Sequence, residues 1–163
     1  MKYFLQGLTM GPAYVAPIGL QNLFVINSAL THTRKRALLT ALIVIFFDVT
    51  LALACFFGVG AVMQRYEWLQ MVILLLGSLI VLYIGVGLLR AKAEEIDRSR
   101  TADSIPKTIS SACVVTWFNP QALIDGTMML GAFYVTLPAA QSTSFISGVA
   151  LASCLWFTGL TLL

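Results

Sequence analysis

Two aspartates lie inside long stretches of this sequence that carry no other charge. Asp48 is the only charged residue in 37–64, and Asp125 is the only one in 108–163. A charged side chain at the centre of a lipid bilayer costs about 2.5–3.5 kcal/mol on insertion scales, and neither stretch contains a basic residue to pair with its aspartate. Each aspartate therefore indicates either a protonated carboxyl bonded to a neighbouring helix, or a site for a cationic substrate, a proton or both.

Proline and glycine, with side-chain amides beside them, interrupt two of the apolar stretches. Residues 16–22 read Ala-Pro-Ile-Gly-Leu-Gln-Asn, and residues 116–121 read Thr-Trp-Phe-Asn-Pro-Gln. Proline inside a helix removes a backbone hydrogen bond, and the freed carbonyl groups need partners where no water is present. Asparagine and glutamine side chains can supply those partners or hold a ligand. The predicted substrate-binding residues are Gln21, Asn22, Asp48, Asn119 and Asp125, and the predicted helix breaks are Pro17, Gly19 and Pro120.

The chain around these residues has the composition of a membrane protein. Hydrophobic residues make up 59% of the 163 residues and charged residues only 10%, against about 25% charged residues in soluble domains. A helix needs about 20 apolar residues to cross the hydrocarbon core. The uncharged stretches therefore predict an all-α membrane protein with five transmembrane helices, at 4–30, 37–63, 68–89, 109–137 and 143–163.

The two interrupted stretches fall at corresponding places, in the first and the fourth predicted span. Paired spans interrupted by glycine or proline are typical of repeat transporters with a binding site near the bilayer midplane. Because a repeat of three spans is odd, the second repeat must enter the membrane from the opposite side. We therefore predict a first three-helix repeat at 1–90, a charged cytoplasmic loop at 91–107 and an incomplete, inverted second repeat of two helices at 108–163.

Basic residues predict the orientation of these spans. Loops rich in lysine and arginine stay in the cytoplasm, and the loops after the first and third spans carry eight of the ten basic residues. The prediction is a multi-pass protein of the bacterial cytoplasmic membrane with its N-terminus outside. The eight residues are Arg34, Lys35, Arg36, Arg90, Lys92, Arg98, Arg100 and Lys107, and the two on the opposite side are Lys2 and Arg65.

Other features of the sequence limit the function classes. The three cysteines, Cys55, Cys113 and Cys154, have neither metal-binding nor redox spacing, so we expect small buried side chains rather than a metal or disulfide site. Gly7 and Gly11 form a small-xxx-small pattern that allows close helix packing; packing within one chain is the simpler expectation, and a homodimer contact stays open. We expect no catalytic residues, no cofactor, no metal and no nucleic-acid partner, and hence no enzyme.

The interrupted segments also resemble a known family. Segment 17–27, Pro-Ile-Gly-Leu-Gln-Asn-Leu-Phe-Val-Ile-Asn, followed by a basic turn, resembles the first span of the lysine exporter (LysE) family. Segment 116–120, followed by Asp125, resembles that family's fourth span. Asp48, the long charged loop and the Trp156-Phe157 pair are also similar to the family pattern. Together these motifs extend over nearly the whole chain.

The resemblance implies an exporter of amino acids driven by the proton gradient. Asp125 after Asn-Pro is more similar to the branch that exports lysine and arginine than to the branch that exports homoserine and threonine. The chain departs from the family pattern at Leu20, where a proline is common. Family members also have a sixth span, so a fragment, a truncated product or a chain completed by another subunit is expected.

We therefore expect a secondary transporter that exports basic amino acids, with the amino-acid substrate, protons and the lipid bilayer as its partners. Export of neutral amino acids or of other small cationic metabolites is an alternative. A membrane thiol-disulfide electron-transfer protein is less favoured, because the first span has no cysteine. A third class is an ion-conducting or structural subunit. A channel would show electrical conductance that does not saturate with amino acid.

Overall fold

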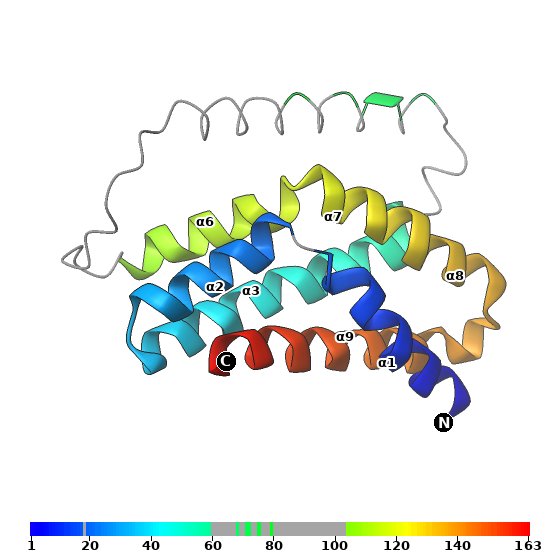
Figure 1. The fold of residues 1–163 in the computed structure, drawn as a ribbon. Coiled ribbons are helices and arrows are strands. Elements are labelled where there is room, and N and C mark those ends of the chain that lie inside the picture. Colours follow the sequence, from blue (N-terminus) through cyan, green and yellow to red (C-terminus); the bar gives the residue numbers. More distant parts are fainter. Residues whose placement is uncertain (18, 60–67, 69–70, 73–74, 76–78, 80–103) are drawn as a thin grey trace.

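The computed structural model describes residues 1–17, 19–59, 68, 71–72, 75, 79 and 104–163. Within these residues the regular structure is helical and contains no strand (Figure 1), which agrees with the predicted all-α class. Most of the predicted third span and of the charged loop 91–107 lies outside the described residues. The helices are α1 (Lys2–Val15), α2 (Leu20–Thr31), α3 (Arg34–Ala54), the π-helix η1 (Cys55–Val59), α6 (Ile105–Trp117), α7 (Pro120–Asp125), the π-helix η2 (Gly126–Leu130), α8 (Gly131–Thr136) and α9 (Ala139–Leu162).

The first predicted span consists of two helices whose directions differ by 81°. Helix α1 ends at Val15 and α2 begins at Leu20, on either side of Pro17 and Gly19. Gly19 precedes α2 in an extended conformation, with φ −122° and ψ −174°. The backbone therefore leaves helical geometry where the local sequence disfavours a continuous helix.

The fourth predicted span is also divided. Helix α6 begins at Ile105, four residues before the predicted start, because Pro106 is accepted in the first turn of a helix. It ends at Trp117, and α7 restarts at Pro120, where the missing proline N–H would have no helical partner in any case. The side-chain oxygen of Asn119 caps α7 by accepting from the Gln121 backbone N–H at 3.1 Å. Pro120 thus begins a new helix rather than kinking an old one.

The remaining long helices are continuous. By length and hydropathy, Arg34–Gly58 and Ala139–Leu162 can each cross a membrane, as can α1 and α2 taken together as one broken span. Helix α9 begins at Ala139, earlier than the predicted residue 143, because Pro138 directly precedes its first turn. Large apolar side chains on the outside of the bundle, including Phe46, Met128 and Leu155, suit contact with lipid rather than with water.

Helix α3 lies between α6 and α9, and α1 packs along α9 (Figure 1). Gly7 and Gly11 make the contact of α1 with α9 close: a Cβ on Gly7 would overlap the carbonyl oxygen of Phe145, and one on Gly11 would overlap the Cβ of Ala152. The small-xxx-small pattern is therefore used within the chain, as the simpler expectation had it. The fully buried side chains of the core include Phe56, Phe145, Val149, Val25, Val44 and Phe157.

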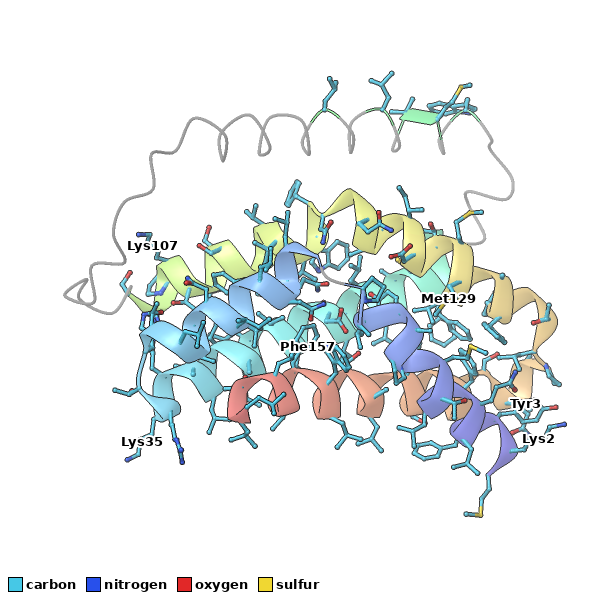
Figure 2. The ribbon with its side chains drawn as sticks, viewed as in Figure 1. Lys2, Tyr3, Lys35, Lys107, Met129 and Phe157 are labelled. Atoms are coloured by element: carbon cyan, nitrogen blue, oxygen red, sulfur yellow. The ribbon has the colours of Figure 1, made fainter. Side chains whose placement is uncertain are left out.

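The ends of the bundle differ in charge. Figure 2 shows Lys35 and Lys107 at one end and Lys2 and Tyr3 at the other. Arg36 also reaches from the start of α3 to the start of α6, where its guanidinium donates to the Thr108 hydroxyl at 2.7 Å. Among the described residues, Lys35, Arg36 and Lys107 thus lie together, at the end of the bundle away from the N-terminus.

Candidate functional site

The two helix breaks lie next to each other, with Asn119 buried between them and Gly19 half-buried. The side-chain nitrogen of Asn119 lies 3.5 Å from the position that a Cβ on Gly19 would occupy. Residues far apart in the sequence are thus neighbours, each at the start of the helix that follows its break. Backbone that leaves helical geometry at membrane depth must be buried in protein or line a polar cavity. Here each break provides part of the polar surroundings of the other.

Asp48 lies beside this meeting point. Its side chain, on α3, is 1% exposed, and its Oδ1 accepts a hydrogen bond from Gln21 Nε2 at 3.2 Å. The same nitrogen donates to the Thr116 hydroxyl at 3.2 Å. Gln21 belongs to the first turn of α2 and Thr116 to the last turn of α6. One amide group therefore connects the buried carboxylate of the second span with the breaks of the first and the fourth.

The Asn22 side chain forms hydrogen bonds with the backbone of the first break. Its Nδ2 donates to the carbonyl oxygens of Val15 at 3.0 Å and of Pro17 at 2.8 Å. Its Oδ1 accepts from the indole Nε1 of Trp156 on α9 at 3.0 Å. Both amide hydrogens are thus engaged, so the side chain supplies the partners that the freed carbonyl groups require. This arrangement favours a role in holding the break open over direct contact with a substrate.

Trp156 positions Asn22, and replacing it by phenylalanine is expected to destabilise the first break. Without the indole N–H, the buried Asn22 oxygen has no donor, which costs about 1–3 kcal/mol. We expect a lower melting temperature of the purified protein and slower transport. The matched control is Trp117→Phe, because the Trp117 indole lies on the exposed surface and makes only a long contact, 3.4 Å, to the Thr50 hydroxyl. Equal melting temperatures for the two variants would contradict this role for Trp156.

Asp125 occupies a different environment from Asp48. It is half-buried at the end of α7, and both of its carboxylate oxygens accept from Gln121 Nε2 at 2.9 Å. Gln121 is exposed and stands one helical turn earlier. The sequence grouped the two aspartates, but in the structure Asp48 accepts from the buried Gln21 of the first break, whereas Asp125 accepts from the exposed Gln121 of the second. Tyr14 lies between the two environments, within electrostatic range of both carboxyls.

The predicted residues thus fall into two groups. Gln21, Asn22, Asp48 and Asn119 lie at the meeting breaks, whereas Asp125 lies further along the fourth span and is more accessible. Sequence reasoning did not assign Thr116, Tyr14, Ser153 or Trp156 to the site. In the part of the chain that the structure describes, no three His, Cys, Asp or Glu residues are placed to share a metal ion, and all three cysteines are free thiols.

Comparison with known proteins gives matches along the whole chain. A family model described as LysE type translocator matches residues 13–163. The arginine exporter protein ArgO of Enterobacter sp. (strain 638) is 32% identical over 167 residues, covering 100% of this chain and 78% of that protein. ArgO of Salmonella newport (strain SL254) is 33% identical over 172 residues with the same coverage. ArgO of Klebsiella pneumoniae (strain 342) is 33% identical over 170 residues, 99% of this chain and 77% of that protein. No solved structure gives a significant match.

Proposed function

This chain belongs to the LysE type translocator family, and from that premise we propose that it exports a basic amino acid, arginine or lysine, across the bacterial cytoplasmic membrane. It is a transporter and not an enzyme. The observation that carries the proposal is the contact between the two helix breaks beside a buried carboxylate, Asp48. The similarity to proteins named arginine exporters favours a basic substrate.

The breaks suit the backbone groups of an amino acid. Helix α2 begins at Leu20 beside Asn119, and the first turn of a helix presents free N–H groups and the positive end of its dipole. We assign this end of α2 to the substrate α-carboxylate. Asn119 and Gln21 stand next to it and offer polar groups to the α-ammonium group. In repeat transporters, anionic substrate groups bind at such half-helix N-termini.

Asp125 is assigned to the cationic side chain of the substrate. A carboxylate with both oxygens accessible can pair with a guanidinium through two parallel hydrogen bonds. Both Asp125 oxygens point to an exposed partner, Gln121, whose neutral amide an incoming guanidinium can displace. A neutral amino acid would gain nothing from this carboxylate. The proposed preference for basic substrates therefore depends on Asp125.

The wider architecture completes the proposal. We propose five spans, an inverted arrangement of the units 1–90 and 108–163, and alternating access in which one unit rocks against the other, driven by the proton gradient. The shared end of Arg36, Lys35 and Lys107 supports a cytoplasmic position for that end and an external N-terminus. A homodimer would need a surface other than the one around Gly7 and Gly11, because α9 already covers those residues.

Efflux from cells tests this function directly. Cells that lack their own basic amino-acid exporters and are fed arginine- or lysine-containing dipeptides should tolerate more dipeptide when they produce this chain. Asp125→Asn should reduce arginine efflux at least tenfold, a loss of about 1.4 kcal/mol, because the guanidinium loses its counter-charge. Asp97→Asn, the same chemical change in the segment 91–107, is the control and should behave like the wild type.

Two outcomes would argue against the proposal. Efflux of alanine from alanine dipeptides that exceeds arginine efflux would indicate a neutral substrate. Wild-type arginine efflux by Asp125→Asn would remove that carboxylate from substrate binding. Membrane abundance of each variant, measured by immunoblot, separates a loss of transport from a loss of protein.

A further inference from the structure

Three buried oxygen atoms from three different helices lie close together, one of a carboxyl group and two of hydroxyls beside it. They are Oδ2 of Asp48 on α3, the hydroxyl of Tyr14 on α1 and the hydroxyl of Ser153 on α9. Tyr14 is 5% exposed, Asp48 1% and Ser153 0%. Within the described residues, none of the three atoms has a hydrogen-bond partner. More than about 90% of buried polar groups in proteins have such a partner, so three together at one place require a common cause.

The two hydroxyls lie beside the carboxyl. Ser153 and Tyr14 are both near enough to hydrogen-bond to the Asp48 side chain, but their positions fall outside the geometry of an ordinary hydrogen bond. The other carboxylate oxygen, Oδ1, is held by Gln21. The Oδ2 atom and the two hydroxyls beside it therefore form a buried cluster of oxygen atoms that can bind a small ligand.

The chemistry of the three atoms indicates which ligand they can bind. The site contains one carboxylate and two hydroxyls, so it offers oxygen ligands and a single negative charge, which suits a hard monovalent cation. A substrate guanidinium fits poorly because its paired hydrogen bonds need both carboxylate oxygens. One of them is held by Gln21, which, unlike the exposed Gln121 at Asp125, is buried and also bonded to Thr116.

We propose that Asp48, Tyr14 and Ser153 bind the small cation that drives export, a proton or a sodium ion, while the substrate's side chain binds separately at Asp125. This assignment rests on the proposed export function and divides the two membrane carboxylates between ion and substrate. A hydroxyl can donate to a carboxylate or accept from a carboxylic acid, so Tyr14 and Ser153 can serve Asp48 with or without its proton.

The site is connected to the breaks through Gln21. A hydrogen bond from an amide to a carboxylate is stronger than one to a neutralised carboxyl group. Binding of a cation at Asp48 therefore weakens the contact that holds the first turn of α2 against α3 and, through the Thr116 hydroxyl, against α6. The groups that face Asp48 from the packed elements are Tyr14 on α1, Gln21 on α2, Cys55 at the start of η1 and Ser153 on α9, and Asp125 acts on Tyr14.

Reconstitution of the 163-residue chain in liposomes tests this assignment with two transport measurements. One follows arginine movement driven by a pH gradient or by a sodium gradient, and the other follows arginine exchange at equal concentrations without a gradient. For Tyr14→Phe and Ser153→Ala, the loss in driven transport should exceed the loss in exchange by about tenfold, because each variant removes one hydrogen-bonding oxygen from a charged site. The matched controls are Tyr134→Phe and Ser147→Ala, whose hydroxyls lie away from Asp48 and which should match the wild type in both measurements.

The gradient that drives wild-type transport identifies the cation as a proton or as sodium. Equal losses of exchange and driven transport in Tyr14→Phe and Ser153→Ala, or wild-type cation dependence in both, would overturn the assignment. A wild-type protein that neither exchanges nor moves arginine would instead refute the proposed function. The site is then judged by melting temperature alone, since a bound cation stabilises the folded state. The melting temperature of the wild type should change more than that of the two variants when sodium replaces choline or when the pH is changed. An equal change in all three proteins would overturn the assignment.

Discussion

Replacing Asp48 by asparagine is expected to abolish net export while leaving the folded protein in the membrane. The substitution preserves the shape of the side chain and removes its charge and its proton. Gln21 Nε2, which donates to Asp48 Oδ1 at 3.2 Å, can donate to the asparagine carbonyl oxygen instead. The helix contacts made through Gln21 therefore survive, whereas a transported cation loses its only buried carboxylate among the described residues.

The cost of burying a charge distinguishes a functional role of Asp48 from a structural one. A carboxylate at the bilayer centre costs about 2.5–3.5 kcal/mol on insertion scales, so a side chain retained only for packing gains nothing from being charged. The Asp48→Asn substitution removes that cost, and we expect the variant to be at least as abundant and as thermally stable as the wild type. Export should fall by more than about a hundredfold, the equivalent of roughly 2.8 kcal/mol.

The measurement is gradient-driven arginine transport per unit of protein in liposomes, with the melting temperature of the same preparation beside it. Thr50→Val on the same helix is the control, because the Thr50 hydroxyl bonds the Phe47 carbonyl within α3 and otherwise accepts a long contact, 3.4 Å, from the exposed Trp117 indole. Wild-type export by Asp48→Asn would remove this carboxylate from the mechanism. Loss of folded protein would show that the carboxyl has a structural role.

The parts of the site that depend on local chemistry could be read from the sequence. Proline at positions 17 and 120 and glycine at 19 disfavour a continuous helix whatever surrounds them, and the helices end and restart beside them. The freed carbonyl groups required partners, and Asn22 supplies them. Asp48 could be identified because an ionisable side chain is costly in an apolar membrane-spanning stretch and usually marks a functional site.

The parts that depend on which helices pack together could not be predicted in the same way. Thr116 and Thr127 look equivalent in the sequence, as hydroxyls in apolar helices. Thr127 bonds the Leu123 carbonyl of its own segment at 2.7 Å, the usual outcome for such residues, whereas Thr116 accepts from Gln21 on another helix. Only the packing of α2 against α3 and α6 distinguishes them. The same holds for Ser153 and Tyr14, whose common neighbour is Asp48.

Helix ends and the setting of Asp125 show a related limit. Charge marked the edges of the predicted spans, yet α6 extends back past Lys107 to Ile105, because a charged side chain at a helix end can reach the aqueous interface.

Asp125 was grouped with Asp48 on composition alone. In the structure it pairs with Gln121 one turn away, a local contact typical of helix surfaces, and so differs from Asp48 in access and in partners.

A methyl group added at Gly148 is expected to separate α1 from α9 and to destabilise the whole bundle. The new Cβ would overlap the carbonyl oxygen of Phe4 and lie 2.8 Å from the backbone nitrogen of Leu8. These are backbone atoms of α1, which cannot turn aside as a side chain can. Overpacking of this kind costs about 1–3 kcal/mol, occasionally more, and we expect Gly148→Ala to lower the melting temperature and the yield of folded protein.

Gly159→Ala provides a control of the opposite sign on the same helix. A Cβ at Gly159 meets no atom within 4 Å, and replacing glycine by alanine inside a helix gains about 0.5–1 kcal/mol. If glycine were needed in α9 only for backbone flexibility, both variants would change stability in the same direction. If close contact with α1 is the reason, Gly148→Ala lowers the melting temperature and Gly159→Ala raises it or leaves it unchanged. Because α1 carries Tyr14 and α9 carries Ser153, the same displacement should also reduce the change in melting temperature that the coupling cation causes. A Gly148→Ala protein with the melting temperature and the cation dependence of the wild type would refute the backbone contact.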